Sequence, residues 1–168
     1  MLDSILPGLA NAANIHPMLV HFPIALWLAA LLLHLWGMLR DSNGIRQCGR
    51  WLLYLGTLGG LAAVLTGFQA AGQLGHDSPG HDLVHLHRNL MVAATGLALV
   101  ACIYGRIAAR RDSRGKQWLL VVLLAALAGL ATLGADRGAY MVFGHGVGVR
   151  APEAGQAGPG HEHGHDDD

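Results

Sequence analysis

The sequence predicts an all-α integral membrane protein, an up-down four-helix bundle with both termini on the outer, periplasmic side. Four apolar runs each approach the roughly 20 residues that cross a bilayer. A helix of a soluble protein rarely stays apolar on every face for so long. The basic residues gather in two of the connections between the runs, and this asymmetry sets the orientation. A chain of 168 residues is long enough for one domain.

The first element is a predicted helix over about 17–39. No basic segment precedes it, and it is longer than the apolar part of a secretory signal, so we expect it to remain as a helix. Pro17 suits a first helical turn, where its missing N–H costs nothing. Pro23 removes one helical hydrogen bond and is expected to kink the opening turns, which would aim His21 into the bundle.

The other predicted helices cover about 51–74, 83–104 and 118–139, and complete a transmembrane domain of residues 1–149. Glycines from Gly134 onward are expected to break the fourth helix. Residues 150–168 are rich in Gly and Pro and then in His and Asp, which predicts a disordered tail. Histidines in that tail could bind copper, nickel or zinc loosely, or could simply be solvated.

The charges orient the chain and exclude several functions. Basic residues follow the first run (Arg40, Arg46, Arg50) and the third (Arg106, Arg110, Arg111, Arg114, Lys116). Cytoplasmic loops carry such residues, so the sequence predicts a multi-pass protein of the bacterial inner membrane. These loops are short and lack interleaved aromatic residues, which argues against nucleic-acid binding. There is no C-x-x-C-H motif for covalent haem attachment.

The histidines are placed unevenly. Of the 11 histidines only His34 falls toward the cytoplasmic half. His21 lies about one turn into the first helix, and His85 and His87 lie about one turn into the third. Because the first and third helices of such a bundle are diagonal partners, these side chains could meet at matched depth. Haem iron accepts two axial histidines, so the sequence predicts a haem b site near the outer surface.

Four alternatives stay open at this site. His85 and His87 lie on different faces of their helix, so one points inward, and spacing does not decide which. The small residues Gly56, Gly60, Ala63 and Gly67 could make room for a macrocycle or could serve ordinary helix packing. Arg88 and Arg137 could pair with haem propionates or extend to the membrane interface. His145 could cover or ligate the site, whereas His16, His76 and His81 are expected to be surface residues.

The segments "IHPMLVHFPIALW", "HLHRNLMVAATG" and "GAYMVFGHGVGV" together resemble a bacterial membrane-protein family named domain of unknown function 2231. The resemblance covers roughly residues 14–149. In the third helix, relatives carry a histidine as H-x-x-x-N or as H-R, and this sequence satisfies both. It departs from the family where Arg137-Gly138 replaces a Gly-Gly pair. The layout is similar to four-helix b-type cytochromes, which implies haem b and electron transfer by analogy.

The leading hypothesis is therefore a haem-binding electron-transfer protein with His21 and His87 as axial ligands. Electrons would pass between membrane quinol and a periplasmic cytochrome or larger redox complex, and an electron-transfer subunit is favoured over a stand-alone enzyme. One alternative is copper or zinc held by His16, His21, His85, His87 and His145. The other is a non-catalytic membrane subunit of a respiratory complex whose histidines are structural.

Overall fold

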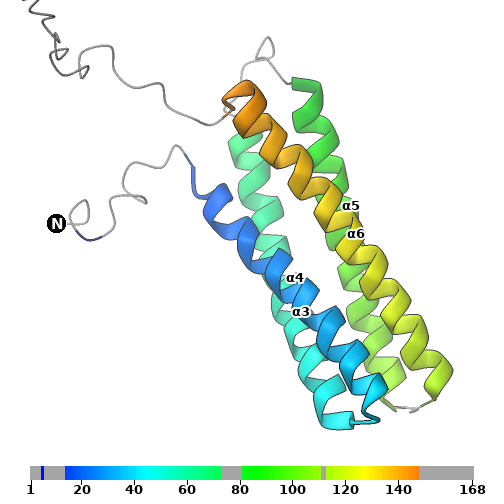
Figure 1. Ribbon diagram of the computed structural model, residues 1–168. Coiled ribbons are helices and arrows are strands. Elements are labelled where there is room, and N and C mark those ends of the chain that lie inside the picture. The colour runs from blue at the N-terminus through cyan, green and yellow to red at the C-terminus, as the bar shows by residue number, and fades with distance from the viewer. Residues whose placement is uncertain (1–4, 6–13, 73–80, 111–112, 148–168) are drawn as a thin grey trace, which may run out of the picture.

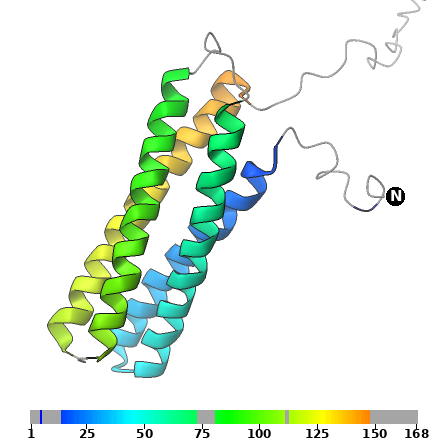
Figure 2. The same ribbon diagram turned by 180° about the vertical axis from the view of Figure 1, so that it is seen from behind.

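Four long helices pack side by side in up-down order. The computed structural model describes Ile5 and residues 14–72, 81–110 and 113–147. Its helices are α3 (His16–Leu39), α4 (Asn43–Ala71), α5 (His81–Arg110) and α6 (Arg114–His145). All four are long and apolar enough to cross a membrane. Figure 1 shows the bundle, and Figure 2 shows it from behind.

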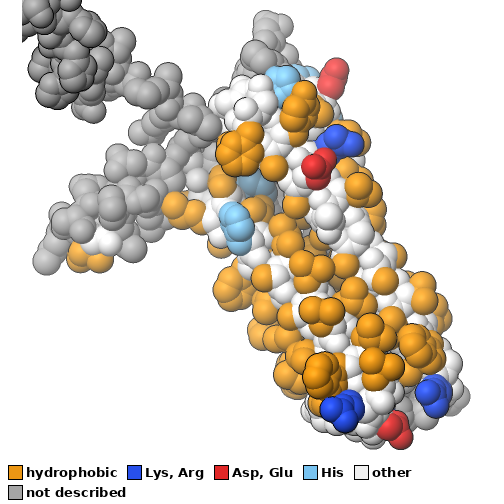
Figure 3. All heavy atoms as spheres, viewed as in Figure 1, with side chains coloured by type: hydrophobic (Ala, Val, Ile, Leu, Met, Phe, Trp, Pro, Cys, Tyr) orange, Lys and Arg blue, Asp and Glu red, His pale blue; other side chains and the backbone are white. Residues whose placement is uncertain are grey.

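The helices pair as two hairpins. α3 packs most extensively on α4, and α5 on α6, while α4 with α5 and α3 with α6 join the hairpins. α3 and α5 are thus diagonal partners, as the sequence predicted. Trp27 and Leu53 fill part of the interior. Three leucines of α6 (Leu120, Leu124, Leu127) and several alanines of α5 fill the rest. Large apolar side chains cover much of the outside, as a lipid-facing surface requires, and Figure 3 shows them along the length of one face.

The helices extend past the predicted bounds at several ends, because hydropathy marks where a helix leaves the bilayer rather than where it stops. Arg46 and Arg50, expected in a loop, belong to α4, which begins after the cap residue Ser42. The expectation that glycines break the fourth helix was wrong for Gly134, Gly138 and Gly144, since α6 continues to His145. It ends at Gly146, whose φ of 65° is left-handed and suits glycine.

The two hairpins repeat one another at an offset of 71 residues. Leu39 ends α3 and Arg110 ends α5, while the cap residues Ser42 and Ser113 precede α4 and α6. Every buried residue of α4 has a buried counterpart at this offset in α6, from Arg46 and Gln117 at one end to Ala63 and Gly134 at the other. The hairpins are therefore related by an approximate two-fold axis along the bundle.

Candidate functional site

Two histidine rings meet at the end of the bundle that carries the start of α3 and α5. The ring centres of His16 and His87 are 6.3 Å apart, and the ring planes cross at 82°. The side-chain oxygen of Asn14 accepts a hydrogen bond from the His16 backbone N–H (3.2 Å), and Pro17 follows in the first turn. Since α3 and α5 are diagonal partners, this pair bridges the two hairpins close to their common axis.

Each ring is fixed by a main-chain carbonyl of its own hairpin. Nδ1 of His16 lies 2.9 Å from the Ala63 carbonyl oxygen, and Nδ1 of His87 lies 2.7 Å from that of Gly134. A carbonyl only accepts, so Nδ1 of each ring carries the hydrogen and Nε2 of a neutral ring keeps its lone pair. Thr66 Oγ1 is a further contact of His16 Nδ1, at 3.3 Å.

A glycine one turn beyond each carbonyl provides the surface on which the ring lies. A Cβ at Gly67 would come within 3.0 Å of His16 Cε1, and one at Gly138 within 3.2 Å of His87 Cε1. Both contacts are tighter than ordinary van der Waals distance. The stripe of small residues on α4 therefore lets the His16 ring approach the helix at Gly67. Deeper in the bundle, the indole of Trp27 packs against Gly56 and Gly60 of the same stripe.

The arrangement matches the chemistry of a metal-binding imidazole pair. Histidine ligands usually donate the other ring N–H to a carbonyl or carboxylate, which fixes the tautomer and leaves the ligating nitrogen free. Imidazoles on opposite sides of one ion have ring centres about 6 Å apart, because metal–nitrogen bonds are about 2.0–2.1 Å. Among the residues that the structure describes, no cluster of three or more His, Cys, Asp or Glu is placed for a metal ion. Two axial histidines suffice for haem iron, whereas zinc takes four ligands.

On α3, His16 is the histidine that faces the bundle, whereas the sequence predicted His21 there. His21 is exposed on the outside of the helix, so the expectation that it points into the bundle was wrong. The interpretation of His16 as a surface residue was also wrong, because its ring is part-buried and hydrogen-bonded to α4. Pro23 and Trp27 occupy the buried face of α3 instead. His21 lies five residues beyond His16, which places it on a different face of a helix with 3.6 residues per turn.

On α5 the two candidate histidines are both part-buried and contact different neighbours. His87 turns inward toward α6. His85 lies between its neighbours: Arg88 Nη2 donates to Nδ1 of His85 (2.8 Å), and Nε2 of His85 lies 3.0 Å from Nε2 of His81. The Arg88 guanidinium also stacks over the Phe68 ring of α4, at 5.7 Å.

The remaining described candidates, Arg137 and His145, contact residues of their own helix. Arg137 contacts the carboxylate of its neighbour Asp136 at 3.6 Å. His145 is exposed in the last turn of α6 and packs edge-on against Tyr140, with ring centres 5.1 Å apart. His76 and the tail histidines lie outside the described residues. The pairing of Arg88 and Arg137 with haem propionates stays a prediction.

The decisive signal in the sequence was the internal repeat. His16, Ala63 and Gly67 stand in the same register as His87, Gly134 and Gly138. Hydropathy does not reveal this relationship, because the repeated positions are small or polar residues within apolar runs. Comparison of the two hairpins at an offset of 71 residues would have selected His16 as the partner of His87.

Comparison with known families identifies the chain. The family described as "Predicted membrane protein (DUF2231)" matches residues 12–151, and the chain belongs to this family. The match includes all four helices. No curated protein and no solved structure matches the chain.

Proposed function

We propose that this member of the DUF2231 family is a membrane haem protein of the b type, in which His16 and His87 would hold the haem iron. The observation that carries the proposal is the oriented imidazole pair. Both Nδ1–H groups are held by carbonyls, at 2.9 and 2.7 Å, and the ring centres are 6.3 Å apart. Neither Nε2 has a hydrogen-bond partner among the described residues.

The chain would hold and tune the group through its two hairpins. His16 and its carbonyl partner belong to the first hairpin, and His87 and its partner to the second, so ligation would clamp the hairpins together. A hydrogen bond from Nδ1–H to a carbonyl makes the imidazole a stronger donor, which favours the oxidised state of a bound metal. When bound, haem supplies reversible one-electron chemistry at its iron.

The position of the pair supports a role in electron transfer. It lies at one end of a membrane-spanning bundle, the end that the positive-inside rule assigns to the periplasm. A group held there is close to water-soluble partners on that side and remains within reach of a lipid-soluble quinol. We therefore propose transfer between the quinol pool and a periplasmic redox protein in the bacterial inner membrane.

The test is the absorbance of the purified protein in detergent. The reduced-minus-oxidised spectrum should show the Soret and alpha bands of haem b, with iron in equal amount to the chain. His16→Ala and His87→Ala should each abolish the spectrum. His21→Ala is the matched control on the exposed face of α3 and should leave it unchanged.

Two outcomes contradict the proposal. A colourless protein that contains copper or zinc would replace it with a metal-handling function. A haem spectrum that survives both His16→Ala and His87→Ala would place the ligands elsewhere, and loss in His21→Ala alone would restore the sequence-based assignment.

A further inference from the structure

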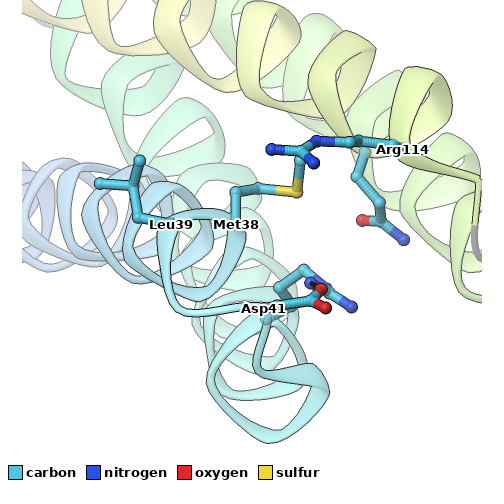
Figure 4. A pocket seen from close by; sticks show the side chains of 6 residues that line it. Met38, Leu39, Asp41 and Arg114 are labelled. Carbon is cyan, nitrogen blue, oxygen red and sulfur yellow. Dashed lines mark hydrogen bonds and ion pairs between the residues drawn. The ribbon is translucent and has the colours of Figure 1, made fainter.

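The opposite end of the bundle carries a polar cavity of about 430 Å³. It lies at the connection of α3 to α4 and at the first turn of α6. The lining residues are Met38, Leu39, Asp41, Arg46, Arg114 and Gln117. In Figure 4 the side chains of Met38, from α3, and Arg114, from α6, extend toward one another, and Asp41 lies at the α3–α4 connection.

Two of the lining side chains are almost completely buried, which is unusual for their type. Arg46 is 4% exposed and Gln117 is 2% exposed. They occupy the same place in the two hairpins, since they are 71 residues apart and each lies in the first turn of its helix. The repeat that brings two histidines together at one end thus brings two buried hydrogen-bonding side chains together at the other.

The buried pair is fixed in place by hydrogen bonds to main-chain carbonyls and to side chains. Arg46 donates to the Gly37 carbonyl (3.3 Å), to Asp41 (3.4 Å) and to the side chain of Asn43. Gln117 Nε2 donates to the Ala108 carbonyl (3.1 Å). These bonds tie the ends of α3 and α5 to the starts of α4 and α6, so the cavity wall is a preformed part of the fold.

The charge of the cavity favours an anion. Arg46 and Arg114 contribute two guanidinium groups against the single carboxylate of Asp41, which already contacts Arg46. Arg114 has no acidic partner among the described residues. Further basic residues belong to the same end of the bundle (Arg40, Arg50, Arg106, Arg110, Lys116). Guanidinium groups bind phosphate oxygens in a planar, two-point geometry.

A buried polar side chain also lies one helical turn from Met38, one of the residues that line the cavity. His34, fully buried, is one helical turn deeper than Met38 on the same face of α3. The Gln117 side chain and the Arg46 main chain are its hydrogen-bonding neighbours, although neither ring nitrogen meets the strict geometry of a hydrogen bond.

We propose that this cavity binds the phosphate group of an anionic membrane lipid, with Arg114 and Arg46 as the cationic contacts. Met38 and Leu39 give the cavity an apolar rim next to the lipid-facing surface, which favours a lipid over a soluble phosphate compound. Basic pockets between transmembrane helices bind anionic head groups in this way. The inference is independent of the histidine pair and of haem.

The test uses the full chain, purified and mixed with phosphatidylcholine and phosphatidylglycerol in equal amounts. Native mass spectrometry then counts the lipids that remain bound. Wild type should retain phosphatidylglycerol in preference, and Arg114→Gln should lower its affinity about tenfold, the size of one hydrogen bond to a charged group. Arg40→Gln is the matched control, because Arg40 is exposed at the same end and does not line the cavity.

A competition with inorganic phosphate distinguishes a lipid phosphate from a soluble phosphate compound as the ligand of the cavity. If the lipid is the ligand, millimolar phosphate should neither displace it nor raise the melting temperature. If phosphate alone stabilises wild type but not Arg114→Gln, the site is confirmed and its ligand is a soluble phosphate compound. Equal lipid retention and equal phosphate response in wild type, Arg114→Gln and Arg40→Gln would overturn the proposal.

Discussion

His16 and His87 occupy the same place in two successive helical hairpins, and each donates its Nδ1–H to a carbonyl 47 residues further along the chain. The ring pair therefore lies on the approximate two-fold axis that relates the hairpins. A site on such an axis receives one equivalent ligand from each half. This relationship explains why one histidine at the start of α3 is paired with another inside α5.

The glycines beneath the rings are predicted to be essential to the site. Gly67→Ala and Gly138→Ala place a methyl group about 3 Å from an imidazole carbon, so the ring must shift. If the pair holds haem, we expect affinity to fall about 10–100-fold, as for other residues that orient a metal ligand. The measurement is the haem content per chain of each variant, determined from the absorbance of the pyridine–haem complex.

Gly96→Ala and Gly129→Ala are the controls, because a Cβ at either position meets no atom within 4 Å. These variants should keep full haem content and should be as stable as wild type or slightly more so, since alanine favours helix. Equal losses in all four variants would mean that the effect is general to α4, α5 and α6 rather than specific to the rings.

Packing of the Trp27 indole predicts a stability effect that is independent of any cofactor. A Cβ at Gly60 would lie 2.7 Å from Trp27 Cζ2. Gly60→Ala should therefore lower the free energy of unfolding by about 1–3 kcal/mol, the usual cost of overpacking a core. Thermal unfolding in detergent, followed by circular dichroism, measures it.

The double variant Gly60→Ala, Trp27→Leu tests whether a clash with the indole causes the loss of stability. The smaller side chain removes the clash, so the double variant should be less destabilised than the two single changes together. Additive losses would show that the alanine acts through something other than the indole.

Arg46 is predicted to stabilise the turn between α3 and α4. Its guanidinium is buried and bonded to the Gly37 carbonyl and to Asp41, a residue with a φ of 48°. Arg46→Ala leaves these groups without their donor and should cost about 2–3 kcal/mol. Arg40→Ala, at an exposed position, should change stability by less than about 0.5 kcal/mol. Chemical or thermal unfolding in the same detergent compares the two, and equal values would contradict this role.

Cys48 provides a test of orientation. It is exposed in α4 at the end opposite the histidine pair, whereas Cys102 is part-buried. If this end faces the cytoplasm, a membrane-impermeant maleimide should label Cys48 only after the cells are permeabilised. The reverse control is His145→Cys in a Cys48→Ser, Cys102→Ser background, which should be labelled on intact cells. Labelling of Cys48 on intact cells would invert the assigned orientation.

The helices themselves were predictable because hydropathy acts over whole segments. Four runs of about 20 apolar residues define four spans, and their number sets the diagonal relation of α3 and α5. The sequence did not decide whether His85 or His87 points inward, because both are polar residues near one helix end. Only the position of α6, with the Gly134 carbonyl opposite, selects His87.

The sequence by itself determined the class of the protein, its four apolar spans and the concentration of histidine at one end, because composition and periodicity are properties of single segments. The tertiary structure alone decided which histidines meet. His21 is buried or exposed according to the rotation of α3 against α4, and that rotation is set by Trp27 packing on Gly56 and Gly60. Once the indole occupies that surface, His16 faces the axis and His21 faces outward. The site therefore depends on contacts between helices, which no single apolar run contains.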